Sequence, residues 1–179
     1  MNGVVVRALQ ADDAAAFARF VEEVPAGERR FLKERLEDPV ATFERWRADA
    51  AACRLVGVHG TDIAGIAAAF PGTGWSAHVA ELRLIVSPRH RRRGVGRALA
   101  RRALVEAIKL GCTHVYVEVV AEQRALVSRF CDLGFAPEAL VRDFVRDNAG
   151  EHHDLMLLTH RVDDHRAELE TIGLQDIAG

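Results

Sequence analysis

The pattern of apolar and polar positions along the chain predicts seven strands and six helices. Short apolar, β-branched-rich runs predict strands over residues 4–6, 53–58, 63–70, 81–86, 113–120, 140–146 and 154–159. Helical spacing predicts a helix that starts at Asp12 or Asp13 and breaks at residues 25–27, followed by helices over residues 28–36, 39–51, 94–110, 122–133 and 163–172.

Turn signals arrange these elements as hairpins on either side of a strand–helix–strand unit. Residues 59–62 (His-Gly-Thr-Asp) and 147–150 (Asp-Asn-Ala-Gly) are typical hairpin connections. Residues 81–120 predict a right-handed crossover between two strands. Because no linker interrupts the order, residues 1–179 are expected to form one α/β (α+β) domain, with a C-terminal helix and tail over 162–179.

Two of the predicted elements have clear faces. In the helix over 94–110, the residues expected to face the core are Leu99, Ala103, Ala107 and Leu110. In the strand over 113–120, alternation separates His114, Tyr116 and Glu118 from Val115, Val117 and Val119.

Composition narrows the class of protein. The 179 residues include 24 basic and 26 acidic side chains, a near balance that argues against a basic nucleic-acid coat or an acidic disordered tail. Lysine occurs only at Lys33 and Lys109, and eight arginines lie between Arg83 and Arg102. Arginine recognises phosphate and carboxylate in a planar, bidentate way. A nucleic-acid patch would interleave aromatic residues here, and this stretch has none.

The chain has no sign of a membrane or secretory segment. No apolar run reaches the roughly 18–20 residues of a membrane span, and residues 1–10 lack the charged start and long apolar stretch of a secretory signal. Cys53, Cys112 and Cys131 form no Cys-x-x-Cys pair, which argues against a disulfide framework or a cysteine zinc site. We therefore expect a cytoplasmic protein without membrane association.

The arginine-rich stretch follows a strand and opens a helix through a glycine-containing turn. Gly94 and Gly96 remove side chains where backbone N–H groups would approach a ligand. The unpaired N–H groups of the first helical turn, at the positive end of the helix dipole, form an anion site. Neighbouring guanidinium groups add charge-assisted hydrogen bonds.

Two familiar phosphate loops fit this stretch poorly. The P-loop needs Gly-Lys-Ser/Thr, but Val95 and Arg97 follow the two glycines. The dinucleotide fingerprint needs a third glycine or alanine where Leu99 stands. Glu118 does lie at the distance of a ribose-binding acid, so a dinucleotide-dependent enzyme stays open as an alternative.

A third loop fits better. Arg91-x-x-Gly94-x-Gly96 resembles the Arg/Gln-x-x-Gly-x-Gly/Ala signature of the GNAT acyltransferase superfamily. Residues 81–88 are similar to the fourth strand of that family, and Leu133-Gly134-Phe135 is similar to its Leu-Gly-Phe ending. The resemblance implies a mixed, mostly antiparallel sheet of about seven strands flanked by helices. It also implies that the fourth and fifth strands, over 81–86 and 113–120, splay apart to admit a thioester.

The resemblance also implies an acyl-CoA site. The backbone N–H groups from Arg92 to Arg97 would hold the pyrophosphate, and the strand Leu84 to Val86 would run beside the pantetheine arm. Gln123 stands where the family often has an asparagine, and Phe130 stands where it often has a tyrosine whose hydroxyl lies near the sulfur. The implied acetyl-CoA-binding residues are Leu84, Ile85, Val86, Arg91, Arg92, Arg93, Gly94, Val95, Gly96, Arg97, Gln123 and Phe130.

The expected chemistry is direct attack of an amine on the thioester, without a metal. Glu81 is the first candidate for the base, by its place on the fourth strand, and Glu118 on the fifth strand is the second. The alternative roles for Glu81 are an exposed charge at the end of the strand or an ion pair with Arg83. Phe130 offers no hydroxyl, which keeps a non-catalytic acyl-CoA-binding or regulatory module as the alternative function.

The acceptor is not readable from the sequence. A small amine, an amino acid, an antibiotic and a protein lysine all remain open, and a homodimer is suggested by the resemblance only. His152 and His153 could suggest a metal site, but adjacent strand residues point to opposite faces, so we expect none there.

Overall fold

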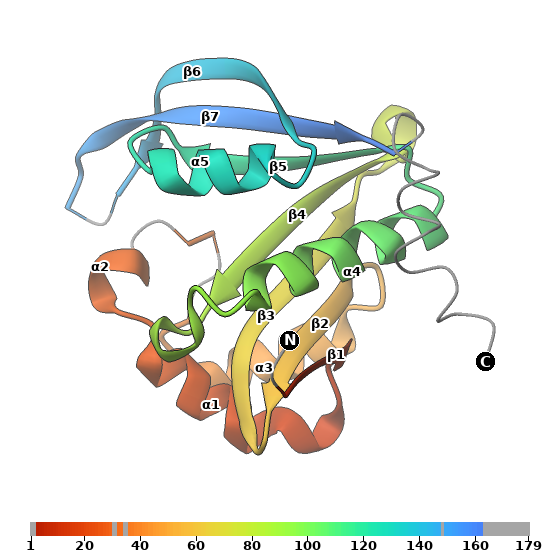
Figure 1. Ribbon diagram of the computed structural model, residues 1–179, viewed down its shortest axis with the longest axis vertical. Coiled ribbons are helices and arrows are strands. Elements are labelled where there is room, and N and C mark those ends of the chain that lie inside the picture. The colour runs from red at the N-terminus through yellow and green to blue at the C-terminus, as the bar shows by residue number, and fades with distance from the viewer. Residues whose placement is uncertain (1–2, 30–31, 34–35, 148, 163–179) are drawn as a thin grey trace. The chain divides into compact units, whose positions relative to one another are not determined.

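The computed structural model describes residues 3–29, 32–33, 36–147 and 149–162 (Figure 1). Across these residues seven strands form one sheet in the order β1-β2-β3-β4-β5-β7-β6. The strands are β1 (Val4–Ala8), β2 (Cys53–His59), β3 (Asp62–Pro71), β4 (Val79–Val86), β5 (His114–Val120), β6 (Ala136–Arg146) and β7 (His152–Arg161). The helices are α1 (Ala14–Glu23), α2 (Ala26–Arg29), α3 (Pro39–Ala48), α4 (Val95–Lys109) and α5 (Arg124–Cys131).

Strand direction confirms the predicted mixed, mostly antiparallel sheet. β1 pairs antiparallel with β2, and β7 pairs antiparallel with both β5 and β6. β4 pairs parallel with β5, as expected for two strands joined through a helix. Their register covers three pairs, from Val79 with His114 to Glu81 with Tyr116, and the divergence implied by the resemblance would follow these pairs.

The chain divides into two compact units. The first comprises Met1–Ala68 and Arg83–Ala100, and the second comprises Ala69–Leu82 and Arg101–Gly179. β3, β4 and α4 contribute residues to both units.

The core of the first unit lies under α1 and α3, which run side by side (Figure 1). The ring of Phe17 packs against Phe43 and Trp46, with centroids 5.5 and 5.3 Å apart. The apolar face of α1 predicted from Phe17, Phe20 and Val21 is fully buried. These three side chains explain why α1 packs with this face inward.

The start of α1 is fixed by a different contact from the one the sequence predicts. Asp13 occupies the N-cap position, but its carboxylate does not cap α1. Instead it accepts two hydrogen bonds of 2.7 Å from the Arg7 guanidinium and one of 2.8 Å from the backbone N–H of Gln10. The short η1 turn (Ala11–Asp13) therefore ties the end of β1 to α1.

Helix α3 shows a regular N-terminus. The Asp38 carboxylate accepts a hydrogen bond of 2.9 Å from the backbone N–H of Ala41, and Pro39 stands at the first helical position, as predicted. The helix ends at Ala48, three residues early, because Asp49 forms a local turn. Its carboxylate accepts from the N–H of Ala51 at 3.0 Å and from Arg54 at 2.7 Å.

The helix predicted over residues 28–36 is wrong in position and length. α2 begins at Ala26, includes Gly27, and ends at Arg29, and residues 32–33 and 36 are not helical. The side chain of Leu36 is buried in the core of the first unit, at 3% exposure. The backbone at Leu36 is not helical, because burial of this side chain in the core outweighs the local preference for a helix.

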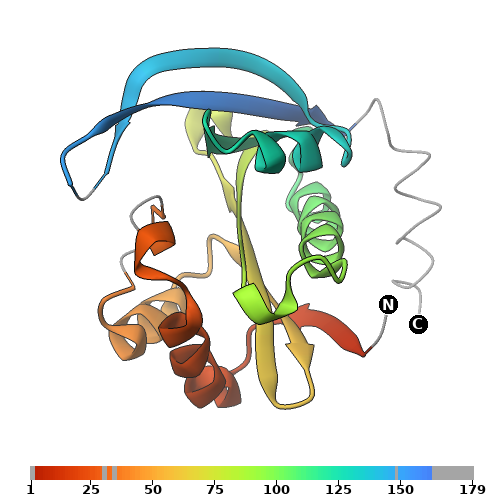
Figure 2. The same cartoon turned by 60° about the vertical axis from the view of Figure 1, so that its left-hand side comes forward.

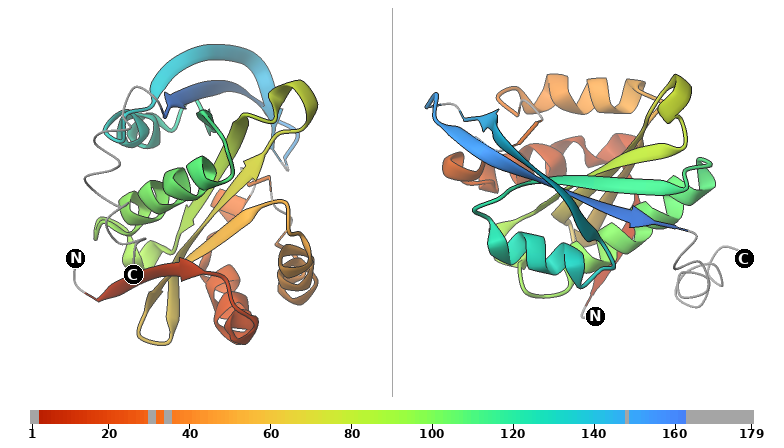
Figure 3. Two further views of the ribbon diagram at one scale, coloured as in Figure 1. Left: turned by 90° about the vertical axis from the view of Figure 1, so that its right-hand side faces the viewer. Right: turned by 90° about the horizontal axis from the view of Figure 1, so that it is seen from above.

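The second unit is built on β5 and the hairpin of β6 and β7 (Figure 2). Burial along β5 alternates as predicted, with Val115, Val117 and Val119 buried and the opposite face half-buried. β6 begins at Ala136, four residues earlier than expected, because its pairing with β7 starts at Thr159. Figure 3 shows β5, β7 and β6 together with α5.

Helix α4 departs from its predicted face at one position. Leu99, Ala103 and Ala107 are buried, but Leu110 is 46% exposed. The helix ends at Lys109, and Gly111 follows with a φ of +83°, so Leu110 leaves the buried face.

Among the described helices, none is long and apolar enough to cross a membrane. The helix predicted over residues 163–172 and Asn148 of the predicted turn lie outside the described residues.

Candidate functional site

The connection from β4 to α4 is the candidate anion site of the first unit. The chain leaves β4 at Ser87, forms the short η3 turn (Pro88–His90), and enters α4 at Val95. Ser87 is completely buried, and its backbone N–H donates to the carbonyl of Ala64 at 2.9 Å. The loop therefore starts from a fixed point at the end of the strand.

The backbone of this loop turns its N–H groups away from the protein's own acceptors. Arg92 and Gly94 have φ angles of 58° and 82°, in the left-handed region that favours glycine. Within the described residues, the N–H groups from Arg92 to Arg97 donate to no other backbone group, and the first helical bond runs from Ala98 to Gly94. Such a run of unpaired N–H groups is an anion-binding arrangement.

The first turn of α4 packs closely on β4 through a glycine. A Cβ atom at Gly96 would lie 3.4 Å from Val86 and 3.7 Å from Leu84. Ile85 points the other way and joins the core cluster of the first unit. Of the three residues predicted to run beside pantetheine, Leu84 and Val86 thus lie next to the first turn of α4, and Ile85 belongs to the core.

Two glycines that the sequence analysis did not single out also bring α4 close to the sheet. A Cβ atom at Gly65 would lie 2.9 Å from both the carbonyl oxygen of Ile85 and Leu99, and Gly57 lies under Val95 and Leu99. Each glycine interrupts an apolar strand run, which is a recognised sign of close approach by another element.

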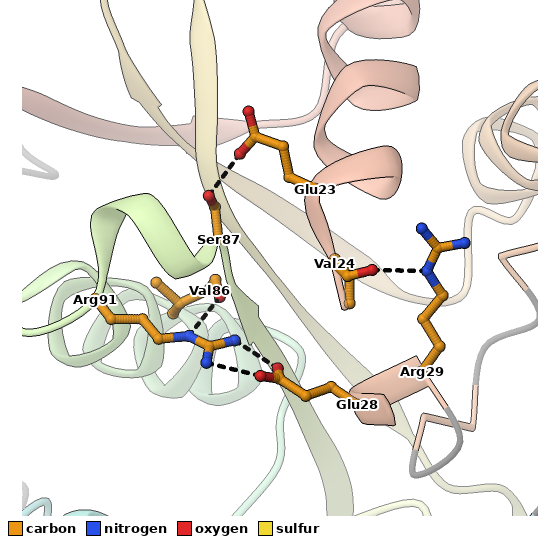
Figure 4. Close-up of polar contacts among 7 residues, drawn as sticks. All are labelled: Glu23, Val24, Glu28, Arg29, Val86, Ser87 and Arg91. Carbon is orange, nitrogen blue, oxygen red and sulfur yellow. Dashed lines mark hydrogen bonds and ion pairs between the residues drawn. The ribbon is translucent and has the colours of Figure 1, made fainter. Parts of the chain in front are cut away.

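Arg91, predicted to bind phosphate, is engaged with the protein itself. Its guanidinium makes two hydrogen bonds to the carboxylate of Glu28, one of them 2.8 Å long, and its Nε donates to the carbonyl of Val86 at 3.2 Å (Figure 4). The bond to Glu28 is the main cause that raises the pKa of Arg91 above its usual value. No local pattern in the sequence points to Glu28, since 63 residues separate it from Arg91.

A second carboxylate contacts the start of the same loop. Glu23, the last residue of α1, accepts a hydrogen bond of 2.6 Å from the Ser87 hydroxyl (Figure 4). It also pairs with Arg89 at 2.9 Å. By contrast, Arg92, Arg93 and Arg97 are exposed and form no ion pair with any described residue. Their guanidinium groups are the ones available to a phosphate ligand.

Both predicted catalytic carboxylates lie in the second unit, near one another along paired strands. Glu81 on β4 is buried, at 8% exposure, and its register partner on β5 is Tyr116. Neighbouring partners in a sheet place their side chains on the same face. Glu118, two residues further along β5, shares that face and is half-buried opposite Leu157 of β7.

The two predicted residues of α5 differ in their surroundings. Gln123 stands half-buried at the N-cap position, without a side-chain capping bond. Phe130 is 5% exposed, and its ring packs on Phe135 with centroids 5.3 Å apart. Phe135 packs in turn on His160 at 5.2 Å. Phe130 therefore belongs to the core of the second unit.

The histidines of the β6–β7 hairpin lie apart from these residues in sequence. His153 Nε2 lies 3.4 Å from Asp147, and its Nδ1 lies 3.6 Å from Glu122. In the described part of the chain, no group of three or more histidine, cysteine, aspartate or glutamate side chains is arranged to hold a metal ion.

Comparison with known proteins identifies the family. Residues 16–135 match the model of the acetyltransferase (GNAT) family. No curated protein sequence matches the chain.

Solved structures of this fold come from several bacteria. A putative acetyltransferase of Salmonella typhimurium with acetyl-CoA shares 20% identity, covers 92% of this chain and 96% of its own, and has a TM-score of 0.76. A GNAT acetyltransferase of Streptococcus pneumoniae shares 19% identity, with 88% and 99% covered and a TM-score of 0.74. Spermidine/spermine N-acetyltransferase of Vibrio cholerae shares 20%, with 93% and 96% covered and a TM-score of 0.72. This chain belongs to the GNAT acetyltransferase family.

Proposed function

We propose that this protein is an N-acetyltransferase that takes the acetyl group from acetyl-CoA and transfers it to an amine acceptor by direct attack. The observation that carries this proposal is the loop from Arg92 to Arg97, whose backbone N–H groups are free of backbone acceptors in a chain of the GNAT family. The Salmonella typhimurium neighbour was solved with acetyl-CoA, which supports the choice of donor.

The loop suits the pyrophosphate of this donor. A pyrophosphate offers several charged oxygens, and the loop offers consecutive N–H donors at the positive end of the α4 dipole. The exposed guanidinium groups of Arg92, Arg93 and Arg97 add positive charge at the same place. Leu84 to Val86 would run beside the pantetheine arm, as the family resemblance implies.

The amine must lose a proton before it can attack the thioester. An alkyl ammonium has a pKa of about 10.4, so deprotonation near pH 7.4 costs about 4 kcal/mol. We assign Glu81 as the base, because it is the buried carboxylate on the strand that leads to the loop. It would accept the proton directly or through a water molecule. Glu118 is the alternative.

The leaving thiolate makes a smaller demand. A thiol has a pKa of about 8.5, so departure without a proton costs only about 1–2 kcal/mol. Phe130 has no hydroxyl and is buried against Phe135. Tyr116, the one tyrosine of the chain, shares a sheet face with Glu81 and is the hydroxyl we assign as the acid.

The experiment is release of free thiol from acetyl-CoA with a panel of amines, comparing Glu81→Gln with Glu118→Gln. Loss of a general base lowers kcat by about 10²-fold or more, and this loss should shrink as the pH approaches the pKa of the amine. Glu118→Gln should lower kcat by less than about tenfold. Full activity of Glu81→Gln from pH 6 to pH 9 would remove Glu81 from this role.

A second candidate function is a non-catalytic acyl-CoA-binding or regulatory module. The burial of Phe130 at the position of the family tyrosine favours it. Both functions predict CoA binding, but only transfer predicts thiol release that depends on an acceptor. Tight binding without release across the amine panel would favour the module.

A further inference from the structure

Both ends of the segment from Ser87 to Arg91 are held by carboxylates of the α1–α2 region (Figure 4). At its start, the Ser87 hydroxyl donates to Glu23 at 2.6 Å. At its end, the Arg91 guanidinium donates twice to Glu28 and once to the carbonyl of Val86. The residues with free N–H groups begin immediately after this held segment.

The α1–α2 turn is itself held by Arg29. Its Nε donates to the carbonyl of Val24 at 2.8 Å (Figure 4). Its Nη2 donates to the carbonyl of Val21 at 2.9 Å. These carbonyls lie at the C-terminal end of α1, where carbonyl groups run out of helical donors. The Val21 carbonyl also accepts from the backbone N–H of Val24 at 3.2 Å. Arg29 thus fixes α2 beside the end of α1 and sets the two carboxylates in place.

In this arrangement, both terminal nitrogens of the Arg91 guanidinium already donate to a carboxylate. A guanidinium binds a phosphate or a carboxylate through two parallel N–H groups, and Glu28 occupies both. A bidentate arginine–carboxylate pair also fixes direction, which a single contact does not. The geometry therefore holds the loop rather than presenting Arg91 to a ligand.

We infer that Glu28 and Glu23 are positioning residues for the phosphate loop, and that Arg91 supports acetyl-CoA binding by holding the loop on Glu28 rather than by contacting the pyrophosphate. This inference rests on the proposed acetyl-CoA function. It makes the α1–α2 region part of the donor site, although no residue of that region belongs to the Arg-x-x-Gly-x-Gly signature.

The direction in which Glu28→Gln changes the affinity for acetyl-CoA distinguishes a positioning role from a purely electrostatic effect. Glu28→Gln removes a negative charge near a site for an anion, and charge alone would tighten acetyl-CoA binding. If Glu28 positions the loop, the same change weakens binding. Glu22→Gln is the matched control, since Glu22 is an exposed residue of α1. None of the ion pairs that the described residues form at this loop involves its side chain, as they join Arg89 to Glu23 and Arg91 to Glu28.

The experiment measures acetyl-CoA affinity by isothermal titration for the full chain and for Glu28→Gln, Arg91→Gln, the double variant and Glu22→Gln. We expect each of the first two changes to weaken affinity by about fivefold to tenfold. The double variant should be no weaker than either, because both changes break the same pair. Glu22→Gln should stay within about twofold of the original chain.

The opposite pattern would overturn the inference. A direct phosphate contact by Arg91 predicts a loss for Arg91→Gln, and unchanged or tighter binding for Glu28→Gln. Additive losses in the double variant also contradict positioning. If the unchanged chain does not bind acetyl-CoA, the proposed function fails as well, whereas binding that Glu28→Gln leaves unchanged removes only the positioning role.

A second donor tests whether the effect is specific to the loop. Acetyl-pantetheine lacks the pyrophosphate, so Glu28→Gln should lower kcat/KM for acetyl-CoA but leave that for acetyl-pantetheine within about twofold. Equal losses with both donors would show a general structural defect and contradict the inference. Should Glu28→Gln not fold, Glu23→Ala, which breaks the Ser87 contact, carries the same expectation.

Discussion

The conformation of Gly94 determines how the loop presents its N–H groups. Its φ is +82°, and a Cβ atom there would have no neighbour within 4 Å. Gly94→Ala would thus cost about 1 kcal/mol of folding stability through backbone strain alone, without a steric clash. We also expect weaker acetyl-CoA affinity, measured by titration beside thermal unfolding.

Two glycines of the first unit provide matched controls for Gly94. Gly27 also has open space around it but lies in α2 without a positive φ, so Gly27→Ala should be neutral or slightly stabilising. Gly60 has a φ of +62° in the β2–β3 turn, so Gly60→Ala should lose similar stability and keep its acetyl-CoA affinity. Equal affinity of Gly94→Ala and the original chain would remove residue 94 from the donor site.

The Asp13–Arg7 pair predicts a pH dependence of stability. Hydrogen bonding to Arg7 is the main cause that lowers the pKa of Asp13 below its ordinary value. A carboxyl group whose pKa is lower in the folded state stabilises the fold above its unfolded pKa of about 3.9, and loses this contribution as the pH falls through the folded pKa. Asp13→Asn should therefore cost about 2 kcal/mol at pH 7.

The difference in the free energy of unfolding between the original chain and Asp13→Asn should shrink below about pH 4, as Asp13 of the original chain takes up its proton. Denaturant unfolding of both proteins at pH 7 and at pH 3 measures it. A cost that is the same at both pH values would mean that packing around Asp13, rather than its charge, stabilises the start of α1.

Arg91 shows the limit of sequence reasoning at the residue scale. The motif Arg91-x-x-Gly94-x-Gly96 identifies the loop and the two glycines, because strand, turn and helix follow one another in sequence. It does not identify Glu28 as the partner of Arg91, since that pairing exists only after α2 has folded beside the loop.

Among the elements, α3 gives the clearest test of a helix cap. Asp38→Ala removes the acceptor for the N–H of Ala41 and should cost about 1 kcal/mol of stability, with acetyl-CoA affinity unchanged. Chemical denaturation measures the first quantity. Glu44→Ala, an exposed position of the same helix, should change stability by less than about 0.5 kcal/mol. Equal effects of the two changes would contradict a cap at Asp38.

Strands were easier to predict than helices in this chain. The apolar runs that became β2, β3, β4 and β5 are bounded by turns or by the loop, so their positions agree within a few residues. The helix predicted over residues 28–36 does not match α2, because Leu36 is buried in the core from a non-helical position. This is a tertiary effect that the periodicity of the sequence does not contain. The strand predicted over residues 140–146 is shorter than β6, because the pairing of β6 with β7, and not its own apolar pattern, sets where it starts.

For the whole molecule, the family resemblance supplied what local patterns could not. The position of β7 between β5 and β6 follows from no pattern of single residues. The signature around Gly94 and Gly96, with Leu133-Gly134-Phe135 downstream, indicated a GNAT sheet, and the match over residues 16–135 confirms the family. The catalytic roles of Glu81 and Glu118 stay predictions.

Transfer of acetyl from CoA to an amine is the central activity proposed for this protein. The most direct measurement follows free thiol and acetylated amine together, with the purified chain, acetyl-CoA and the amine panel. We predict that at least one amine yields thiol and acetylated product in equal amounts, and only when enzyme, donor and acceptor are all present. Absence of acceptor-dependent thiol release across the whole panel, at concentrations that saturate the acetyl-CoA site, would contradict the proposed activity.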